Sequence, residues 1–134
     1  MKLTARQAQA IILAGEARAR EIGVPVNLVV LDGGAHLQAF VRMDGAPLGA
    51  IDLAIRKART AVLFDMPSEQ LWESCKPGGP APTLEISNGG LTAFGGGIPL
   101  KPGDGELLGA VGVSGGLVPQ DLEIATAAVA AFTR

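Results

Sequence analysis

Two apolar runs on either side of a glycine turn constrain the fold of this chain more than any other feature. Residues 24–31 and 35–43 are dominated by apolar side chains, and Asp32-Gly33-Gly34 between them is typical of a tight hairpin turn. A two-residue Gly33-Gly34 loop would place the apolar residues of both strands on one face of the hairpin. The expected pairs are Val30–Leu37, Leu28–Ala39 and Val26–Val41. A slip of one residue would mix the two faces, so the pattern predicts this register.

Helical periodicity surrounds the hairpin. A helix is predicted over residues 4–22, because Thr4 and Gln7 have the spacing of a capping box and Gly23 follows at a position that ends helices. Three further helices are predicted from apolar stripes, caps and prolines. They cover residues 49–64, 69–75 and 120–132. The intervening Lys-Pro-Gly-Gly-Pro-Ala-Pro segment, residues 76–82, is expected to form a long loop.

Three more strands are predicted in the glycine-rich second half, over residues 91–94, 97–101 and 106–114. Gly109 and Gly112 in the last of them are expected to let another element approach closely. Hairpin turns connect most neighbouring strands, so their pairing should be mainly antiparallel. The sequence therefore predicts one α+β domain over residues 1–134. Its five-stranded, mainly antiparallel sheet is flanked by helices, in the order helix-strand-strand-helix-helix-strand-strand-strand-helix.

Composition limits the kind of partner this chain can have. The formal net charge is −2, and this lack of a basic excess argues against nucleic acid as the main partner. The single cysteine, Cys75, fits a reducing compartment, and no apolar run reaches membrane-spanning length, so we expect a soluble cytoplasmic protein without a membrane partner. The mean hydropathy of this short chain is positive, which predicts extra apolar surface that a homo-oligomer would bury.

The residues with the most chemical potential lie between the hairpin and the second helix. His36, the only histidine, is expected on the mixed face of the hairpin, where it could bind haem iron, transfer protons or remain an ordinary exposed side chain. One histidine and no cysteine pair argue against a zinc site, and no metal site apart from haem iron is predicted. Arg56, Lys57 and Arg59 could hold a carboxylate, or could form a solvated helix face. Lys57 could also be a partly buried base.

Glycine-rich loops in the second half offer backbone amides. Ser87-Asn88-Gly89-Gly90 and Gly95-Gly96-Gly97 match neither a Walker loop nor a dinucleotide fingerprint. The plain interpretation is turns with a positive φ, and the alternative is that amides at Asn88, Gly89 and Gly90 line a ligand pocket.

Six motifs, in this order along nearly the whole chain, resemble those of a known family. They are Gly23-Val24-Pro25-Val26, Asp32-Gly33-Gly34-Ala35-His36-Leu37, Arg42-Met43-Asp44-Gly45-Ala46, Lys57-Ala58-Arg59-Thr60-Ala61, Phe94-Gly95-Gly96-Gly97-Ile98-Pro99-Leu100 and Gly109-Ala110-Val111-Gly112-Val113-Ser114-Gly115-Gly116. The chain resembles the GlcG/HbpS-like haem-binding proteins, a group that includes the C-terminal domain of PduO-type cobalamin adenosyltransferases.

The resemblance implies a five-stranded antiparallel sheet flanked by helices, assembly into dimers or larger oligomers, and haem as a ligand of some members. The haem ligand differs within the family, being a threonine in one member and a histidine in another. The threonine corresponds to Thr60 here, whereas the first helix of this chain has no histidine to match the other.

Three functional hypotheses follow. The first is a small-ligand-binding protein whose ligand is haem or a related tetrapyrrole, with Thr60 or His36 near the iron and Lys57, Arg56 or Arg59 near the propionates. The second is an enzyme that acts on a small organic acid in a catabolic pathway. In it, Lys57 or His36 transfers the proton and the amides of residues 88–90 hold the carboxylate. The third is an oligomeric accessory protein without chemistry of its own.

Overall fold

The computed structural model describes residues 2–103 and 105–132. The helices and strands within these ranges follow the predicted order closely. They are α1 (Ala5–Ile22), β1 (Asn27–Asp32), β2 (Leu37–Arg42), α2 (Gly49–Phe64), α3 (Leu71–Cys75), β3 (Gly97–Leu100), β4 (Gly109–Ser114) and α4 (Val118–Phe132), with short 3₁₀ turns at Ser68–Gln70 and Leu84–Ile86. The expected α+β class with helices around an antiparallel sheet is confirmed.

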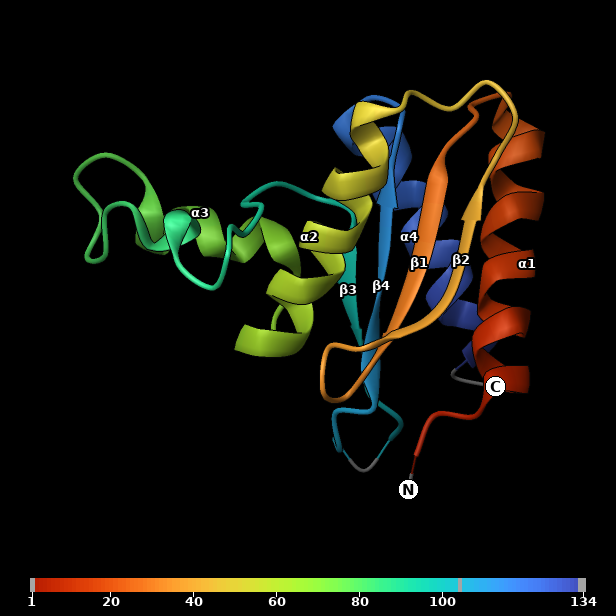
Figure 1. The fold of residues 1–134 in the computed structure, drawn as a ribbon, viewed down its shortest axis with the longest axis horizontal. Coiled ribbons are helices and arrows are strands. Elements are labelled where there is room, and N and C mark those ends of the chain that lie inside the picture. Colours follow the sequence, from red (N-terminus) through yellow and green to blue (C-terminus); the bar gives the residue numbers. More distant parts are fainter. Residues whose placement is uncertain (1, 104, 133–134) are drawn as a thin grey trace.

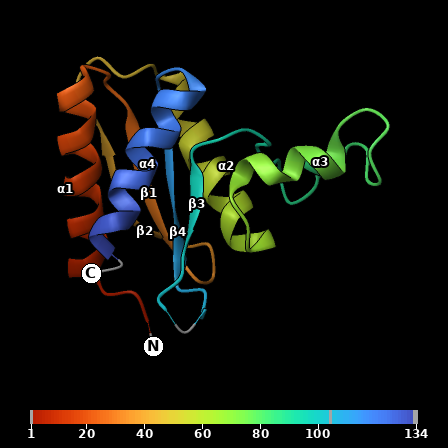
Figure 2. The ribbon, with the colours of Figure 1, turned by 180° about the vertical axis from the view of Figure 1, so that it is seen from behind.

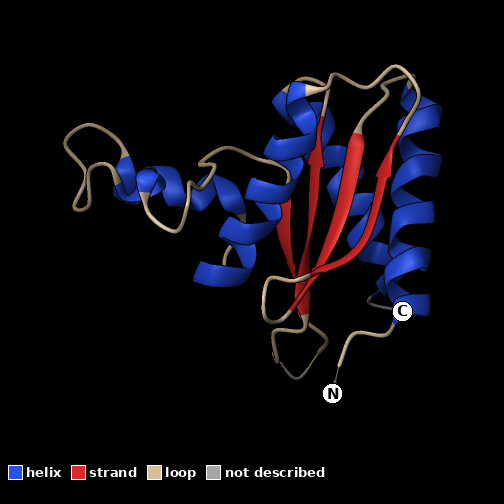
Figure 3. Cartoon of the chain, viewed as in Figure 1, coloured by secondary structure: helices blue, strands red, loops and turns tan. Residues whose placement is uncertain are grey.

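The sheet is antiparallel throughout, with the strand order β2-β1-β4-β3 (Figures 1 and 3). One face packs against α1 and α4, and the other face packs against α2. Alternate residues of β1 serve the two faces, since Leu28 and Val30 join the cluster with α1 and α4 while Val29 and Leu31 join the cluster with α2. All four of these side chains are buried, which explains the unbroken apolar run of this strand.

The prediction of five strands is wrong for the described residues, where the sheet has four. Residues 91–94 lie outside the sheet, because side chains rather than a neighbouring strand bind their backbone polar groups. Thr60 Oγ1 accepts a hydrogen bond from the Thr92 N–H at 3.1 Å, and Ser68 Oγ donates to the Phe94 carbonyl at 2.7 Å. The segment is therefore held at the end of the α2 layer and not at the edge of the sheet.

The hairpin has the predicted faces but a longer loop. The Asp32 N–H donates to the His36 carbonyl at 2.9 Å and the Ala35 N–H donates to the Asp32 carbonyl at 3.0 Å, which closes a three-residue loop. Ala35 takes the left-handed conformation that this loop requires, with φ 65°. The added loop residue and a bulge between Val30 and Leu31 shift the pairing by two residues. Val30 faces Ala39 and Leu28 faces Val41, so the predicted pairs are wrong but the predicted apolar face is kept.

Helix ends follow the sequence signals. Thr4 and Gln7 form the predicted capping box, with the Gln7 N–H 3.1 Å from Thr4 Oγ1 and the Thr4 N–H 2.9 Å from Gln7 Oε1. Gly23 ends α1 with φ 71°. The last helix starts two residues earlier than predicted, at Val118, so Pro119 lies within its first turn.

Glycines let α2 lie directly on the sheet. A Cβ atom at Gly112 would be 2.0 Å from the Ala54 carbonyl oxygen of α2, and one at Gly97 would be 2.2 Å from the Lys57 carbonyl oxygen. The predicted close approach at Gly112 is thus confirmed, and the approaching element is α2. Gly109 faces the backbone of the neighbouring strand, with the Leu31 carbonyl oxygen 2.1 Å from the position of a Cβ.

A projecting segment leaves this layered body after α2 (Figures 1 and 2). We call residues 66–90 the arm. It contains α3 and both 3₁₀ turns, and its small core consists of Leu71 and Cys75 packed with Leu91 of the returning chain. Trp72 and Ile86 of the arm are 49% and 71% exposed. No helix of the described residues is both long enough and apolar enough to cross a membrane.

Candidate ligand-binding site

The arm and the body share a cavity of about 630 Å³. Its lining residues come from the arm, from the segment that returns to the sheet and from the start of α4. They are Glu69, Trp72, Glu85, Leu91, Thr92, Ala93, Phe94, Gly95 and Val118. A mainly apolar cavity of this size with a few polar groups is typical of small-molecule sites.

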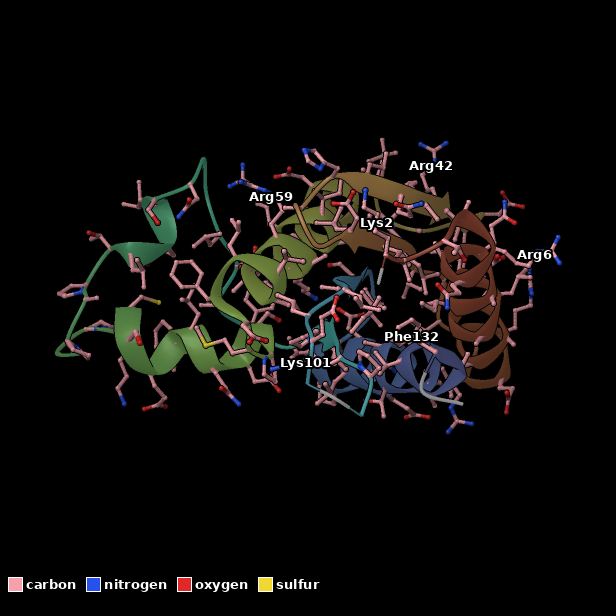
Figure 4. All side chains as sticks on the ribbon, turned by 90° about the horizontal axis from the view of Figure 1, so that it is seen from below. Lys2, Arg6, Arg42, Arg59, Lys101 and Phe132 are labelled. Carbon is pink, nitrogen blue, oxygen red and sulfur yellow. The ribbon has the colours of Figure 1, made fainter. Side chains whose placement is uncertain are left out.

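Side chains of α2 hold the last residues of the arm, directly before the segment that forms one wall of the cavity. Arg59 Nη1 donates to the Asn88 carbonyl at 2.8 Å, and Arg56 Nη1 donates to the Gly89 carbonyl at 3.0 Å. Figure 4 shows Arg59 projecting from α2 near the loop by which the arm returns to the body. The basic cluster of the sequence therefore contacts the arm, and its arginines hold carbonyl groups rather than lying free in solvent.

Thr60 continues this row of contacts one turn along the helix. Its side chain is fully buried, with Oγ1 2.9 Å from the Arg56 carbonyl and 3.1 Å from both the carbonyl and the N–H of Thr92. The hydroxyl accepts from the Thr92 N–H and donates to one of the two carbonyls. Thr60 thus lies behind Thr92, which lines the cavity, and supports the wall from the helix side.

Lys57 is fully buried behind the same wall. Its Nζ donates to the Val113 carbonyl at 2.9 Å and to Asp121 Oδ2 at 3.0 Å, and lies 5.0 Å from the centre of the Phe94 ring. Burial lowers the pKa of this amine, and the charge and hydrogen bond of Asp121 oppose that shift. Asp121 also accepts a hydrogen bond from the Gly116 N–H at 2.9 Å. The ammonium group is therefore enclosed by partners on the protein side of Phe94.

The sequence contained no clear sign of Asp121 as the partner of Lys57. Its place in the first turn of a helix after Pro119 suggests only a residue that favours the helix dipole. The contact joins α2 to α4 across 64 positions of sequence, and no local pattern reports such a separation.

His36 lies at the tip of the hairpin, with its side chain 81% exposed and Nδ1 3.3 Å from Asp32 Oδ1. The same carboxylate oxygen accepts hydrogen bonds from the N–H groups of Gly34 and His36 at 2.9 Å. These hydrogen bonds hold the pKa of the Asp32 carboxyl below its usual value. His36 is not among the residues that line the cavity beside Phe94, so the structure does not bring His36 and Lys57 together over one hollow.

The loop at residues 88–90 is a left-handed turn. Asn88, Gly89 and Gly90 have φ values of 56°, 74° and 104°. The Gly90 N–H donates to the Ser87 carbonyl, while the Asn88 and Gly89 carbonyls point to the arginines of α2. The turn predicted from this sequence is present, and its carbonyl groups face α2.

Sequence reasoning missed the cavity itself. Trp72 and Phe94 are 49% and 42% exposed, which is unusual for the largest apolar side chains of so small a molecule. Their separation in sequence hid their proximity. One feature of the sequence could have indicated Trp72 and Phe94 as cavity residues. They are two of the few aromatic residues of the chain, and both lie next to glycine- or proline-rich loops.

The fold and this site define a class: a small α+β protein with a mainly apolar, open cavity between a projecting arm and the layered body. A family model described as haem degrading protein HbpS-like matches residues 3–130. The protein GlcG of Escherichia coli strain K12 is 38% identical over 113 residues, covering 84% of this chain and 81% of GlcG. The chain belongs to the GlcG/HbpS-like family.

Two solved structures are similar over the whole chain. A PduOC–haem complex superposes with a TM-score of 0.92 at 33% identity, covering 100% of both chains. HbpS superposes with a TM-score of 0.91 at 28% identity, covering 100% of this chain and 92% of HbpS. The resemblance stated from the sequence motifs is thus confirmed at the level of the family and of the fold.

Proposed function

We propose that this protein binds a flat, largely apolar ligand in the cavity beside Phe94, and that the ligand is haem or a related tetrapyrrole. The observation that carries the proposal is the cavity of about 630 Å³, lined by Trp72, Leu91, Phe94 and Val118. The structure of a PduOC–haem complex supports the choice of ligand, because that protein is 33% identical to this chain.

The residues present fit a tetrapyrrole in size and apolar character. The apolar side chains of the lining suit the faces of a macrocycle, and the aromatic rings of Trp72 and Phe94 add stacking surfaces. The polar groups of the lining are the carboxylates of Glu69 and Glu85 and the hydroxyl of Thr92. When bound, haem would supply an iron centre for redox or ligand chemistry.

The basic residues of α2 are the proposed partners of the propionates. Arg59 uses Nη1 on the Asn88 carbonyl, and its remaining N–H groups are suited to a bidentate contact with a carboxylate. Arg56 is also bound to Asp52, with Nε 2.6 Å from Oδ2, so its charge is partly compensated. Within this proposal Lys57 supports Phe94 from behind and Thr60 supports Thr92, while Asn88, Gly89 and Gly90 form the turn that the arginines hold.

Titration with ferric haem tests the proposal. The chain has one tryptophan and no tyrosine, so quenching of Trp72 emission reports contact at the cavity, and the Soret band reports the state of the haem. We expect both signals to saturate together. Ala93→Phe, which fills the cavity, should weaken binding by about tenfold or more. Ala17→Phe, on the exposed side of α1, should leave binding unchanged.

A free-haem spectrum and unchanged Trp72 emission at all haem concentrations would contradict the proposal. Equal haem affinity of the Ala93→Phe and Ala17→Phe variants would show that the binding site lies elsewhere.

Self-association also stays a prediction, and the exposed side chains of Trp72, Ile86 and Leu117 support it. Light scattering of the purified chain tests it.

The proton-transfer alternative stays a prediction as well. Lys57 lies behind Phe94 with its amine bound to Asp121, so this alternative requires the wall to open before a substrate can reach the amine. His36 is accessible and is oriented by Asp32, but it lies on the hairpin and not at the cavity.

A further inference from the structure

The two edges of the sheet differ in how they are closed. At the β3 edge, the Gly97 N–H donates to Ser68 Oγ of the arm at 2.9 Å, and Pro99 has no N–H to offer. A covering segment and a proline are two of the ways in which proteins block an edge strand. The strand order places β2 at the other edge, where the described residues supply no further strand.

Phe40 and Arg42 turn backbone polar groups toward this second edge. The Met43 N–H donates to the Val26 carbonyl at 3.1 Å, on the side of β1. Hydrogen-bonding groups alternate in direction along an antiparallel strand. Val41 therefore also turns its N–H and C=O to β1, whereas Phe40 and Arg42 turn theirs outward. The edge thus offers two donors and two acceptors with the spacing that an extended strand requires.

Side chains of the same stretch are available for contact. Arg42 is exposed, its guanidinium has no hydrogen bond or ion pair within the described part of the chain, and Figure 4 shows it projecting outward. Phe40 and Val41 are half-buried. A groove of about 360 Å³ lies beside the strand, where Phe40 meets Leu13 of α1, and Leu13 is 64% exposed. The edge therefore combines outward backbone groups with side chains that can contact a partner.

We propose that β2 pairs with β2 of a second copy of this chain, antiparallel, about a two-fold axis at Val41. In this register Phe40 of each copy lies opposite Arg42 of the other copy, and the outward N–H and C=O groups of both residues bond across the axis. The bulge beyond Ala39 ends the regular part of the strand, which fixes Val41 near the centre of the pairing. The two four-stranded sheets become one continuous sheet.

The side chains explain why the partner is a second copy. On one face, each Arg42 guanidinium lies against the Phe40 ring of the other copy, which is a favourable cation–π contact. On the opposite face, Val41 meets Val41 in a pair without hydrogen bonds, where cross-strand side chains come closest. A two-fold axis requires a surface that is complementary to itself, and this strand meets that requirement.

Two substitutions at Phe40 test the pairing, because both remove the ring but place opposite charges against Arg42 of the second copy. Phe40→Lys puts like charges together and should weaken dimerisation about tenfold or more. Phe40→Glu puts opposite charges together and should keep the dimer. Phe40→Lys combined with Arg42→Glu should restore it. Sedimentation equilibrium measures the dissociation constants, and circular dichroism checks the fold of each variant.

Hydrogen exchange locates the contact in the unaltered protein. The Phe40 and Arg42 amides should exchange slowly at concentrations where the dimer forms and quickly after dilution. The Val41 amide, which faces β1 in both states, should change little. Arg42→Glu alone should weaken the dimer. Arg6→Glu, the same change of charge on an exposed part of α1, is its matched control and should leave the dissociation constant unchanged.

Each outcome decides the proposal. A monomer at all concentrations overturns it, and so does an oligomer that Phe40→Lys and Phe40→Glu affect equally, because the contact would then lie elsewhere. If both Phe40 variants fail to fold, the exchange experiment decides, since a Phe40 amide that exchanges equally fast at high and low concentration excludes the pairing. The contact lies on β2 and not at the cavity beside Phe94, so its failure leaves the proposed function intact.

Discussion

Among the fully buried side chains of the described residues, Lys57 is the largest. A buried ammonium is stable in a protein when a counter-ion and hydrogen-bond acceptors replace its water. Asp121, the Val113 carbonyl and the face of the Phe94 ring fill these roles. The Lys57–Asp121 ion pair joins α2 to α4, and Lys57 also contacts β4 and the Phe94 ring. Loss of this pair should therefore lower both the stability of the fold and the affinity for a ligand.

Removal of the Lys57 ammonium group should therefore lower the stability of the protein strongly. Lys57→Met keeps most of the side-chain volume but leaves the buried Asp121 carboxylate without its cation, and we expect a loss of about 3–5 kcal/mol in the free energy of unfolding. Lys57→Met combined with Asp121→Asn should lose less than the sum of the two single variants, as measured by urea unfolding.

The control for this pair is Lys101→Met. Its ion pair with Asp65 has a similar N–O distance, 2.9 Å, but its side chain is 38% exposed, so we expect a loss of about 1 kcal/mol or less. Similar losses in Lys57→Met and Lys101→Met would show that burial of the pair has no special importance.

Asp32 gives a pH-dependent prediction. Its pKa is lowered in the folded protein from the usual 3.8 by the Gly34 and His36 hydrogen bonds, so the unfolded chain binds the proton more readily. The stabilisation is complete above pH 3.8 and is lost as the pH falls through the lower folded value. The stability advantage of the unaltered protein over Asp32→Asn should therefore shrink below pH 3.8 in urea-unfolding series.

Individual residues show which contacts could be predicted from the sequence and which could not. The capping box and Gly23 were predictable, because their partners lie within one helical turn. The Arg59–Asn88, Thr60–Thr92 and Lys57–Asp121 contacts were not, because each joins residues about 30 or more positions apart. Their geometry depends on the finished packing of α2, which the local sequence does not encode.

At the scale of elements, the segment at residues 91–94 illustrates the limit of strand prediction. Its composition suggested a strand, but sheet membership requires a neighbouring strand. Here Thr60 and Ser68 bind the backbone groups that a strand would have bound. The hairpin loop is a second case, because Gly33 and Gly34 suggested two loop residues, while Ala35 adopts the left-handed conformation as a third.

Thr60→Val tests the tether between α2 and this segment. The substitution keeps the shape of the side chain but leaves the buried Thr92 N–H without its acceptor, so we expect a loss of about 1–3 kcal/mol. Hydrogen exchange at the Thr92 amide should accelerate more than at β1 amides. Thr126→Val, which removes the hydroxyl that donates to the Leu122 carbonyl on the surface of α4, should change neither quantity appreciably. Unaltered Thr92 exchange in Thr60→Val would rule out the tether.

At the scale of the whole molecule, the distance between α2 and the sheet is set by glycine. Gly112→Ala would place a methyl group 2.0 Å from the Ala54 carbonyl oxygen, and this backbone atom moves only if the whole helix moves. We expect a loss of about 3 kcal/mol or more in the free energy of unfolding. Because α2 carries the residues that support the cavity wall, haem titration should weaken as well.

The matched control is Gly49→Ala at the start of α2, where a Cβ would have no atom within 4 Å. There we expect a change within about 1 kcal/mol, on the stabilising side, since alanine favours the helix. Equal destabilisation by both substitutions would mean that α2 tolerates displacement from the sheet.

The packing of α1 against α4 has a consequence for how the protein folds during its synthesis. Helices α1 and α4 lie side by side on one face of the sheet, and the start of α1 and the end of α4 lie at the same end of the molecule (Figure 2). A nascent chain leaving the ribosome must therefore carry the apolar stripe of α1 uncovered until α4 has been translated. Joining the end of α4 to the start of α1 with a short linker and opening the chain elsewhere would let these helices meet early in synthesis.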